Sequence, residues 1–172
     1  MDTETLGVYL IPGSGASVPQ FATEGSACFD IVANFHHHES VIGYGQQNYQ
    51  QDGYVSSGGW IDIPVGWRVL VPTGLILDIP KGFSVRLHAR SGLALKDGLI
   101  LSNAEGIIDS DYTKELMVMV TATSCHMKIS SGIRLCQAEL VRNQPTKIVH
   151  CMNPPPIKTD RIGGFGSTGL TK

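Results

Sequence analysis

Short apolar segments, each closed by Gly, Pro, Asn or Asp, run through most of the chain and limit its fold more than any other feature. The segments are β-branched or alternate polar with apolar residues, as in FSVRLHA at 83–89, and 20 glycines and 9 prolines punctuate them. Such runs predict strands at 6–11, 27–33, 59–66, 67–79, 83–89, 99–102, 115–123, 133–141 and 146–152. Helical periodicity is confined to a short stretch at 91–95. An all-β sandwich, jelly roll or small barrel follows.

Composition and charge narrow the class of protein. Hydrophobic residues make up 42% and charged residues 16% of the chain, and the formal net charge is -2. This charge argues against non-specific nucleic-acid binding through many phosphates. The acidic N-terminus is unlike a secretory signal, and no apolar run is long enough to cross a bilayer. We expect a cytoplasmic protein with neither a nucleic-acid nor a membrane partner.

The four cysteines are scattered and form no C-x-x-C pair: Cys28, Cys125, Cys136 and Cys151. This spacing favours small buried side chains in a reducing compartment over a disulfide framework or a zinc site.

Residues 34–59 interrupt the strand pattern with a polar sequence rich in Gln, Asn, Gly, Ser and Tyr. The length exceeds that of a hairpin turn, so we expect an inserted surface loop. His36, His37 and His38 within it could form a metal tract. Consecutive residues of an extended chain point to opposite sides, so a surface loop is favoured over a metal site.

The last 21 residues differ from the rest. The sequence MNPPPIKTD at 152–160 predicts a stiff spacer, and RIGGFGSTGLTK at 161–172 is too rich in glycine to form a core. GGFGSTG has the composition of a phosphate cradle, although a disordered end has the same composition. We therefore divide the chain into a β domain at 1–151 and a spacer with a flexible arm at 152–172.

Several polar residues next to strands have two possible roles. Arg90, followed by Ser91 and Gly92, is either a phosphate clamp or a surface turn. Asp30, Arg134 and Gln137, each inside an apolar strand, either make structural pairs or face a ligand or cation. The stretch NAEGIIDSDYTKELMV at 103–118 predicts a β-hairpin in which Gly106 allows close backbone approach. Its two carboxylates, Asp109 and Asp111, could bind metal, activate water or only form a polar turn.

Taken in order, five of these stretches resemble the five motifs of the homotrimeric dUTPase family, including its phage-encoded members. The stretches are PQFATEGSACFDIVA, ARSGLAL, NAEGIIDSDYTKEL, SGIRLCQAELV and RIGGFGSTG. The resemblance implies a jelly-roll-like β barrel, a homotrimer with active sites at subunit boundaries, and Mg²⁺-assisted cleavage of dUTP to dUMP and pyrophosphate. It also implies that Asp109 activates the attacking water, while Asp111 only fixes the hairpin.

The resemblance assigns the other site residues as follows. Residues implied to bind the phosphates are Arg90, Ser91, Gly92, Arg161, Gly166, Ser167 and Thr168. Residues implied to surround the nucleoside are Asn103, Gly106, Ile107 and Ile108 at the uracil edge, Tyr112 at the deoxyribose, Met117 in the pocket wall and Phe165 stacked on the base. Gln137 would hold the phosphates or the water, and Asp30 would bind Mg²⁺ through water.

Some features depart from the family pattern. Lys114 stands where the family usually has a glycine, Arg161 is one residue closer to Phe165 than usual, and residues 34–59 have no counterpart. Two alternative functions remain on this fold. A dCTP deaminase is disfavoured because Met119 occupies the position of its catalytic Glu. A nucleotide-sensing protein would use the arm or residues 34–59 to contact a regulatory protein.

Overall fold

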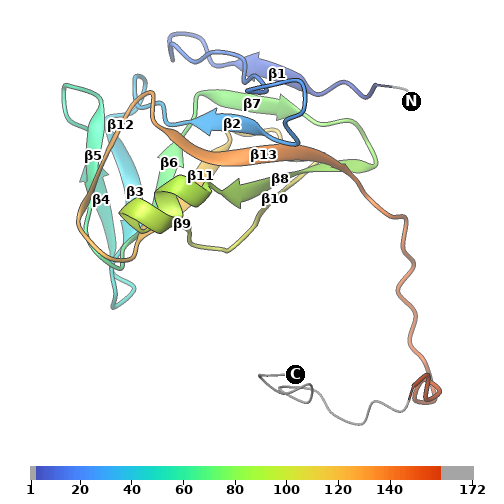
Figure 1. Cartoon of the computed structure of the whole chain (residues 1–172). Helices are drawn as coiled ribbons and strands as arrows, with labels where there is room; N and C mark the ends of the chain where they lie inside the picture. Colours follow the sequence, from blue (N-terminus) through green and yellow to red (C-terminus); the bar gives the residue numbers. More distant parts are fainter. Residues whose placement is uncertain (1–2, 160–172) are drawn as a thin grey trace.

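Two antiparallel sheets make up most of the fold, and two short ribbons of paired strands lie at their edges (Figure 1). The computed structural model describes residues 3–159. The four-stranded sheet has the order β10 (Gly106–Asp109), β8 (Phe83–Ala89), β13 (Arg134–Arg142) and β2 (Phe29–Val32). The five-stranded sheet has the order β4 (Gln50–Tyr54), β3 (Ser40–Tyr44), β6 (Arg68–Pro72), β11 (Met117–Ala122) and β9 (Leu99–Leu101). The ribbons are β1 (Gly7–Leu10) with β7 (Leu75–Asp78), and β12 (Met127–Ser130) with β5 (Trp60–Ile63).

Both sheets contribute their inner side chains to one apolar core. Successive side chains of a strand point to opposite faces, so every second residue enters the core. In β8, Val85 and Leu87 are buried, while Arg86 and His88 face outward. The other sheet supplies Val118 among others, in the same alternating pattern. The prediction of an all-β, jelly-roll-like fold is confirmed.

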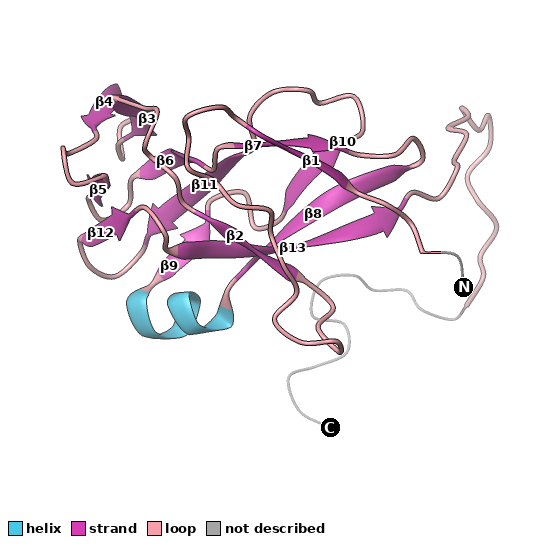
Figure 2. Ribbon diagram, turned by 90° about the horizontal axis from the view of Figure 1, so that it is seen from above, coloured by secondary structure: helices cyan, strands magenta, loops and turns pink. Residues whose placement is uncertain are grey.

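Helical structure in residues 3–159 is limited to a turn at 91–97, assigned as η1 (Leu93–Asp97) (Figure 2). This is the place where the sequence predicts a short helix. Gly98 ends it in the left-handed conformation, with φ 67°. None of the helical structure in this described part is long and apolar enough to cross a membrane.

Residues 34–59 differ from the expected irregular loop, because they contain the hairpin β3–β4. β3 also pairs with β6 through Gly43 opposite Val69, which joins the hairpin to the five-stranded sheet. Val41 is buried, and a Cβ on Gly43 would lie 3.3 Å from the Trp67 ring. The segment is polar in sequence because many of its side chains are exposed and because a glycine, rather than an aliphatic residue, meets that ring. A regulatory partner for this hairpin stays a prediction.

The segment after β13 leaves the body of the fold without forming a strand (Figure 1). The strand predicted at 146–152 is wrong: Ile148 is 95% exposed, and no described strand pairs with this segment. Local β propensity is insufficient where no neighbouring strand supplies hydrogen bonds. Ile157, further along, is also 95% exposed. The proposed boundary near residue 151 stays a prediction, and most of the expected arm, 160–172, lies outside the described residues.

The segment 103–118 connects the two sheets and is not the predicted hairpin. β10 pairs with β8, whereas β11 pairs with β6 and β9. The close approach of β10 to β8 depends on Gly106, where a Cβ would lie 2.9 Å from the Cβ of Leu87. A real Cβ cannot be accommodated at that distance without displacement of one strand.

We predict that Gly106→Ala lowers the free energy of unfolding by about 1–3 kcal/mol, because overpacking forces β10 away from β8. Gly25→Ala is the matched control, since a Cβ there meets nothing within 4 Å. Urea denaturation of both variants measures the difference. Equal stability of the two variants would contradict the close approach.

Candidate functional site

A turn at the end of β10 places the paired carboxylates. The Tyr112 N–H donates to the Asp109 carbonyl over 3.1 Å, and the Tyr112 hydroxyl donates to the Glu115 carbonyl over 2.9 Å. Asp109 and Asp111 are both exposed. Ile107, two residues before Asp109, is 52% exposed in the single chain. The turn, rather than burial, holds Asp109 in place.

Lys114 stands where the family usually has a glycine, yet its backbone is not strained. Among the described residues, the non-glycine positions with positive φ are Asn48 and Ala104. The chain therefore passes Lys114 with an ordinary backbone conformation.

Asp30 on β2 lies between two arginines. Its Oδ1 is 3.3 Å from Arg90 Nε, and its Oδ2 accepts a hydrogen bond from Arg134 over 3.1 Å. The structure therefore shows one of the two roles left open for Asp30, a salt bridge. Oδ1 is buried and accepts no hydrogen bond among the described residues. A carboxylate oxygen with free lone pairs is a hard donor of the kind that suits Mg²⁺ or its bound water, so the residue also fits the second role.

Gln137 on β13 extends this polar row. It lies opposite Asp30 on β2 and opposite His88 on β8, so the three side chains share one face of the sheet. Arg90 follows two residues after His88, and its Nη1 donates to the Arg134 carbonyl over 3.2 Å. Ser91 and Gly92 come next and are exposed. The structure thus gathers Asp30, Arg90 and Gln137 into one polar cluster.

Asp109 is remote from this cluster in the single chain. It lies opposite Ser84, whereas Gln137 lies opposite His88, four residues further along β8 and on its other side. With about 3.3 Å per residue and about 4.8 Å between strands, Asp109 and Gln137 are roughly 16 Å apart. Arg90 lies further still from Asp109, just beyond the end of β8. Asp109 and the cluster of one chain cannot act together on one small group.

The residues expected to read a base lie along an edge strand. β10 pairs with β8 on one side, and none of the strands within 3–159 pairs with it on the other. Every second residue of such a strand turns its N–H and C=O away from its partner, which leaves these groups free to bind a ligand. Asn103 precedes β10 in an exposed turn, and the partly buried Met117 begins β11.

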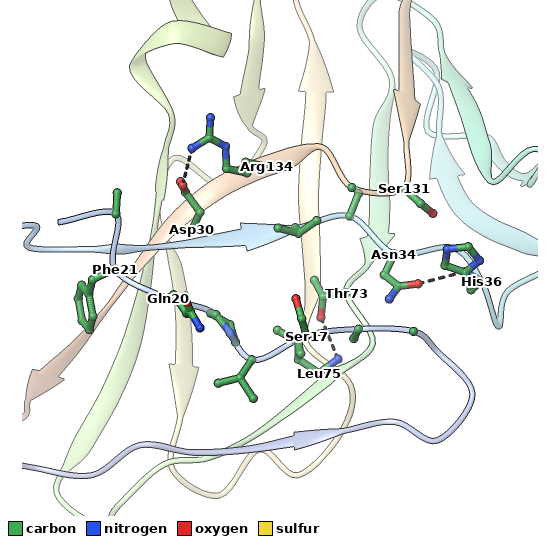
Figure 3. A pocket seen from close by; sticks show the side chains of 18 residues that line it. Ser17, Gln20, Phe21, Asp30, Asn34, His36, Thr73, Leu75, Ser131 and Arg134 are labelled. Carbon is green, nitrogen blue, oxygen red and sulfur yellow. Dashed lines mark hydrogen bonds and ion pairs between the residues drawn. The ribbon is translucent and has the colours of Figure 1, made fainter.

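A cavity of about 730 Å³ lies between residues 15–22 and the region around β2. Figure 3 shows Asp30 and Arg134 on one side of it, with Ser17 and Gln20 across from them. Of the described residues that the sequence assigns to the site, Asp30 alone lines this cavity. The cavity therefore adjoins the polar cluster without forming the nucleotide site.

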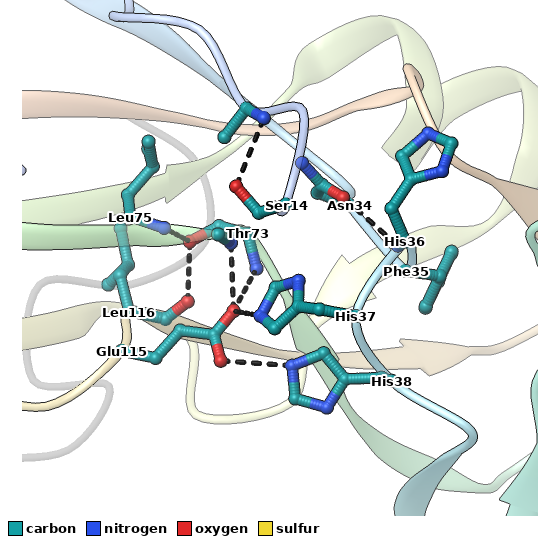
Figure 4. Close-up of polar contacts among 12 residues, drawn as sticks. Ser14, Asn34, Phe35, His36, His37, His38, Thr73, Leu75, Glu115 and Leu116 are labelled. Atoms are coloured by element: carbon teal, nitrogen blue, oxygen red, sulfur yellow. Dashed lines mark hydrogen bonds and ion pairs between the residues drawn. The ribbon is translucent and has the colours of Figure 1, made fainter. Parts of the chain in front are cut away.

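The sequence predicted that Arg134 needs a partner without identifying it, and sequence reasoning missed the part played by Glu115. Arg134 pairs with Asp30, and Glu115 holds the backbone of Thr73 and Gly74 next to two histidines (Figure 4). Both residues lie inside the motif stretches, and this position was the sequence signal that they contribute to the site. Their partners are 41 to 104 residues away in the sequence, which no local pattern reveals.

The cysteines are less uniformly buried than expected. Cys136 is buried, Cys28 is partly buried, Cys125 and Cys151 are exposed, and all four are free thiols. Burial, with a smaller contribution from the Asp30 carboxylate, raises the pKa of the Cys136 thiol from 9.0 to about 12. Burial and then Glu139 also raise the pKa of Cys28.

The raised pKa of Cys136 predicts a loss of stability in alkali. Above pH 9 the unfolded thiol loses its proton while the folded thiol keeps it, so the free energy of unfolding falls by up to ~1.4 kcal/mol per pH unit until about pH 12. Relative to Cys136→Ala, the native protein should lose about 2 kcal/mol more between neutral pH and about pH 10.5. Urea denaturation at each pH tests this; parallel curves for the two proteins would contradict it.

Comparisons with known proteins agree with the motif positions. A sequence profile of the dUTPase family matches residues 55–169. The deoxyuridine 5'-triphosphate nucleotidohydrolase of Brucella melitensis is 34% identical over 168 residues, covering 96% of this chain and 93% of the relative.

Solved structures with this fold include dUTPases of phages. The dUTPase of Staphylococcus bacteriophage 80alpha with dUPNHPP matches with a TM-score of 0.73 and 18% identity over 98% of this chain and 100% of that one. A dUTPase of phage phi11 of S. aureus, described with a structural Mg(II) ion, matches with a TM-score of 0.66 and 16% identity over 89% and 100%. The predicted contacts of Arg161, Phe165, Gly166, Ser167 and Thr168 lie outside the described residues.

Proposed function

The chain belongs to the dUTPase family, and on this premise we propose that it cleaves dUTP to dUMP and pyrophosphate with Asp109 as the base. The family profile carries the proposal, because residues 55–169 include four of the five motifs. The relative from Brucella melitensis, a deoxyuridine 5'-triphosphate nucleotidohydrolase, supports the same activity along nearly the whole chain. The protein is thus a dUTP diphosphatase, and the roles of its residues are our proposal.

The proposed reaction is an attack of water on the α-phosphorus of dUTP. Asp109 accepts a proton from the water, whose oxygen forms the new bond to phosphorus. The bond from the α-phosphorus to the bridging oxygen breaks, and pyrophosphate leaves with that oxygen. The exposed carboxylate of Asp109, held by the turn to Tyr112, is free to meet a water molecule.

Recognition of a deoxyuridine is assigned to β10 and the turn that follows it. The unpaired edge of β10 around Ile107 and Ile108, with the amide of Asn103, would bind the polar edge of uracil. Gly106 brings this strand close to β8, and the resulting tight pocket would leave no space for the methyl group of thymine. The ring of Tyr112 would pack on the deoxyribose and exclude a ribose 2′-hydroxyl, while Met117 lines the pocket.

Phosphate binding is assigned to the polar cluster on β2, β8 and β13. Arg90, Ser91 and Gly92 would hold the phosphates, and Gln137 the phosphates or the water. Asp30 would hold Mg²⁺ through water, and the ion would offset the charge of the triphosphate when bound. Arg161 and residues 165–168 would complete the phosphate contacts, with Phe165 stacked on the base.

The separation of Asp109 from the polar cluster supports a homotrimer with shared sites. Since the two lie roughly 16 Å apart in one chain, the strands of a second chain must supply one of them. The exposed apolar side chains of Ile148, Met152 and Ile157 support the same assembly, because a neighbouring chain would cover them.

We predict that Asp109→Asn lowers kcat by roughly 10²–10⁴-fold, because an amide cannot accept the proton of the water. Binding of dUTP should remain. Asp111→Asn is the matched control, with the same chemical change in the same exposed turn, and should keep most of the activity. Pyrophosphate release and dUTP binding are measured for both. Equal losses in the two variants would sink the assignment of Asp109.

We predict that deletion of residues 161–172 leaves a folded trimer with at least about tenfold lower kcat, because the closing arm excludes water and completes the phosphate shell. Sedimentation and urea denaturation check assembly and stability, and pyrophosphate release checks turnover. Full activity in the shortened protein would refute the closing arm.

A further inference from the structure

Two consecutive histidines and an acid from a distant part of the chain meet beside the β3–β4 hairpin. His37 Nε2 is 3.4 Å from Glu115 Oε1, and His38 Nε2 is 3.0 Å from Glu115 Oε2 (Figure 4). The three ligand atoms that these residues offer all lie within 4.8 Å of one another. Neither histidine has a role in the proposed hydrolysis of dUTP.

A turn brings the two histidines to the same side. The His36 N–H donates to the Asn34 side chain over 3.1 Å, and the His38 N–H donates to the Phe35 carbonyl over 3.0 Å. The chain is therefore bent at this point, and the alternation of an extended strand does not apply. Phe35 is buried and anchors the turn in the core. This geometry removes the reason for which the sequence disfavoured a metal site.

Glu115 presents its carboxylate in a fixed orientation. Its Oε1 accepts hydrogen bonds from the N–H groups of Thr73 over 3.2 Å and of Gly74 over 2.8 Å. These two bonds occupy Oε1, which is also the oxygen nearest to His37, while Oε2 shares a hydrogen bond with His38 over 3.0 Å. A carboxylate held by backbone donors needs no rearrangement to accept a cation.

The His37 ring supplies a second, independent observation. Both of its nitrogens are buried and have no hydrogen-bond partner among the described residues. Its Nε2 lies near Glu115 but is not aligned for a hydrogen bond. The His37 side chain as a whole is 21% exposed, so water has little access to the ring. An unsatisfied buried polar group costs about 1–3 kcal/mol and calls for an ion or water as its partner.

We propose that His37, His38 and Glu115 bind a divalent transition-metal ion of the Zn²⁺ class. Ligands at about 2.0–2.2 Å from a tetrahedral zinc are roughly 3.3 Å from one another. His37 Nε2 lies 3.4 Å from Oε1 and His38 Nε2 lies 3.0 Å from Oε2 of the same carboxylate, so each ring nitrogen stands at about this distance from one of its oxygens. Imidazole nitrogens select Zn²⁺ over Mg²⁺, which prefers oxygen ligands.

A neighbouring cavity gives the ion access and a fourth ligand. The cavity has a volume of about 420 Å³, and its lining includes His38, Glu39 and the turn at 56–59. Water from this cavity occupies the remaining position of the tetrahedron. The ion would join the base of the hairpin to Glu115, whose carbonyl holds the Tyr112 hydroxyl. The site is thus a structural clamp next to the turn that carries Asp109.

Metal binding by the tag-free, full-length protein tests the proposal. The protein is stripped with a chelator and titrated with Zn²⁺ by calorimetry in millimolar Mg²⁺, and with Co²⁺ by visible absorption. We expect one Zn²⁺ per chain and the absorption of tetrahedral Co²⁺. His37→Gln, His38→Gln and Glu115→Gln should each lower the affinity about tenfold or more. Glu115→Gln keeps an oxygen for Thr73 and Gly74, so it separates loss of the ligand from loss of the fold.

His126→Gln is the matched control, because His126 also pairs with a single carboxylate, that of Asp62 over 3.1 Å, and lies outside the cluster. It should bind Zn²⁺ as the native protein does. Thermal unfolding should show a Zn²⁺-dependent rise in Tm for the native protein and His126→Gln but not for His38→Gln. Absence of saturable binding, or equal affinity in His38→Gln and His126→Gln, would overturn the proposal.

Discussion

The pairing of β13 with β8 on one side and β2 on the other is the interaction on which the rest of the structure depends. This nine-residue strand fixes which residues of the three strands face the core and which face outward. A shift by one residue would exchange the two sets, since side chains alternate along a strand. The register therefore places Cys136 in the core and Gln137 beside Asp30. It also explains why the Cys136 thiol titrates so high, while the adjacent residue belongs to a polar site.

The same register sets the distance between the two halves of the proposed active site. β10 extends the sheet on the far side of β8 and carries Asp109 at its outer end. The phosphate cluster lies at the opposite end of β8, where Arg90 follows the strand. In one chain the proposed base, Asp109, therefore lies too far from the proposed phosphate cluster to act with it, which agrees with our proposal of active sites between subunits. Assembly is, in this view, a condition of catalysis rather than an addition to it.

Glu115 links the hairpin region to this arrangement. Its carboxylate contacts the backbone at Thr73 and Gly74 and the rings of His37 and His38, while its carbonyl accepts the Tyr112 hydroxyl. Three segments distant in sequence are therefore held by one residue. A cation at this position would stiffen the hairpin base and the catalytic turn together, which gives residues 34–59 a physical connection to the active site.

The sequence by itself determined the β architecture, because alternation and glycine or proline boundaries reflect local geometry, and it determined the family through five ordered motifs. It failed wherever a residue depends on a distant partner. The hairpin in 34–59 was hidden because many of its side chains are exposed and polar and because Gly43 packs on Trp67. The strand predicted at 146–152 has no described strand to pair with. The segment 103–118 joins two sheets instead of folding on itself. Tertiary structure alone decided that Asp30 meets Arg134, that two histidines converge on Glu115, and that Asp109 lies far from Arg90. Contacts between remote segments are made by packing and hydrogen bonding across the fold, and no local pattern records them.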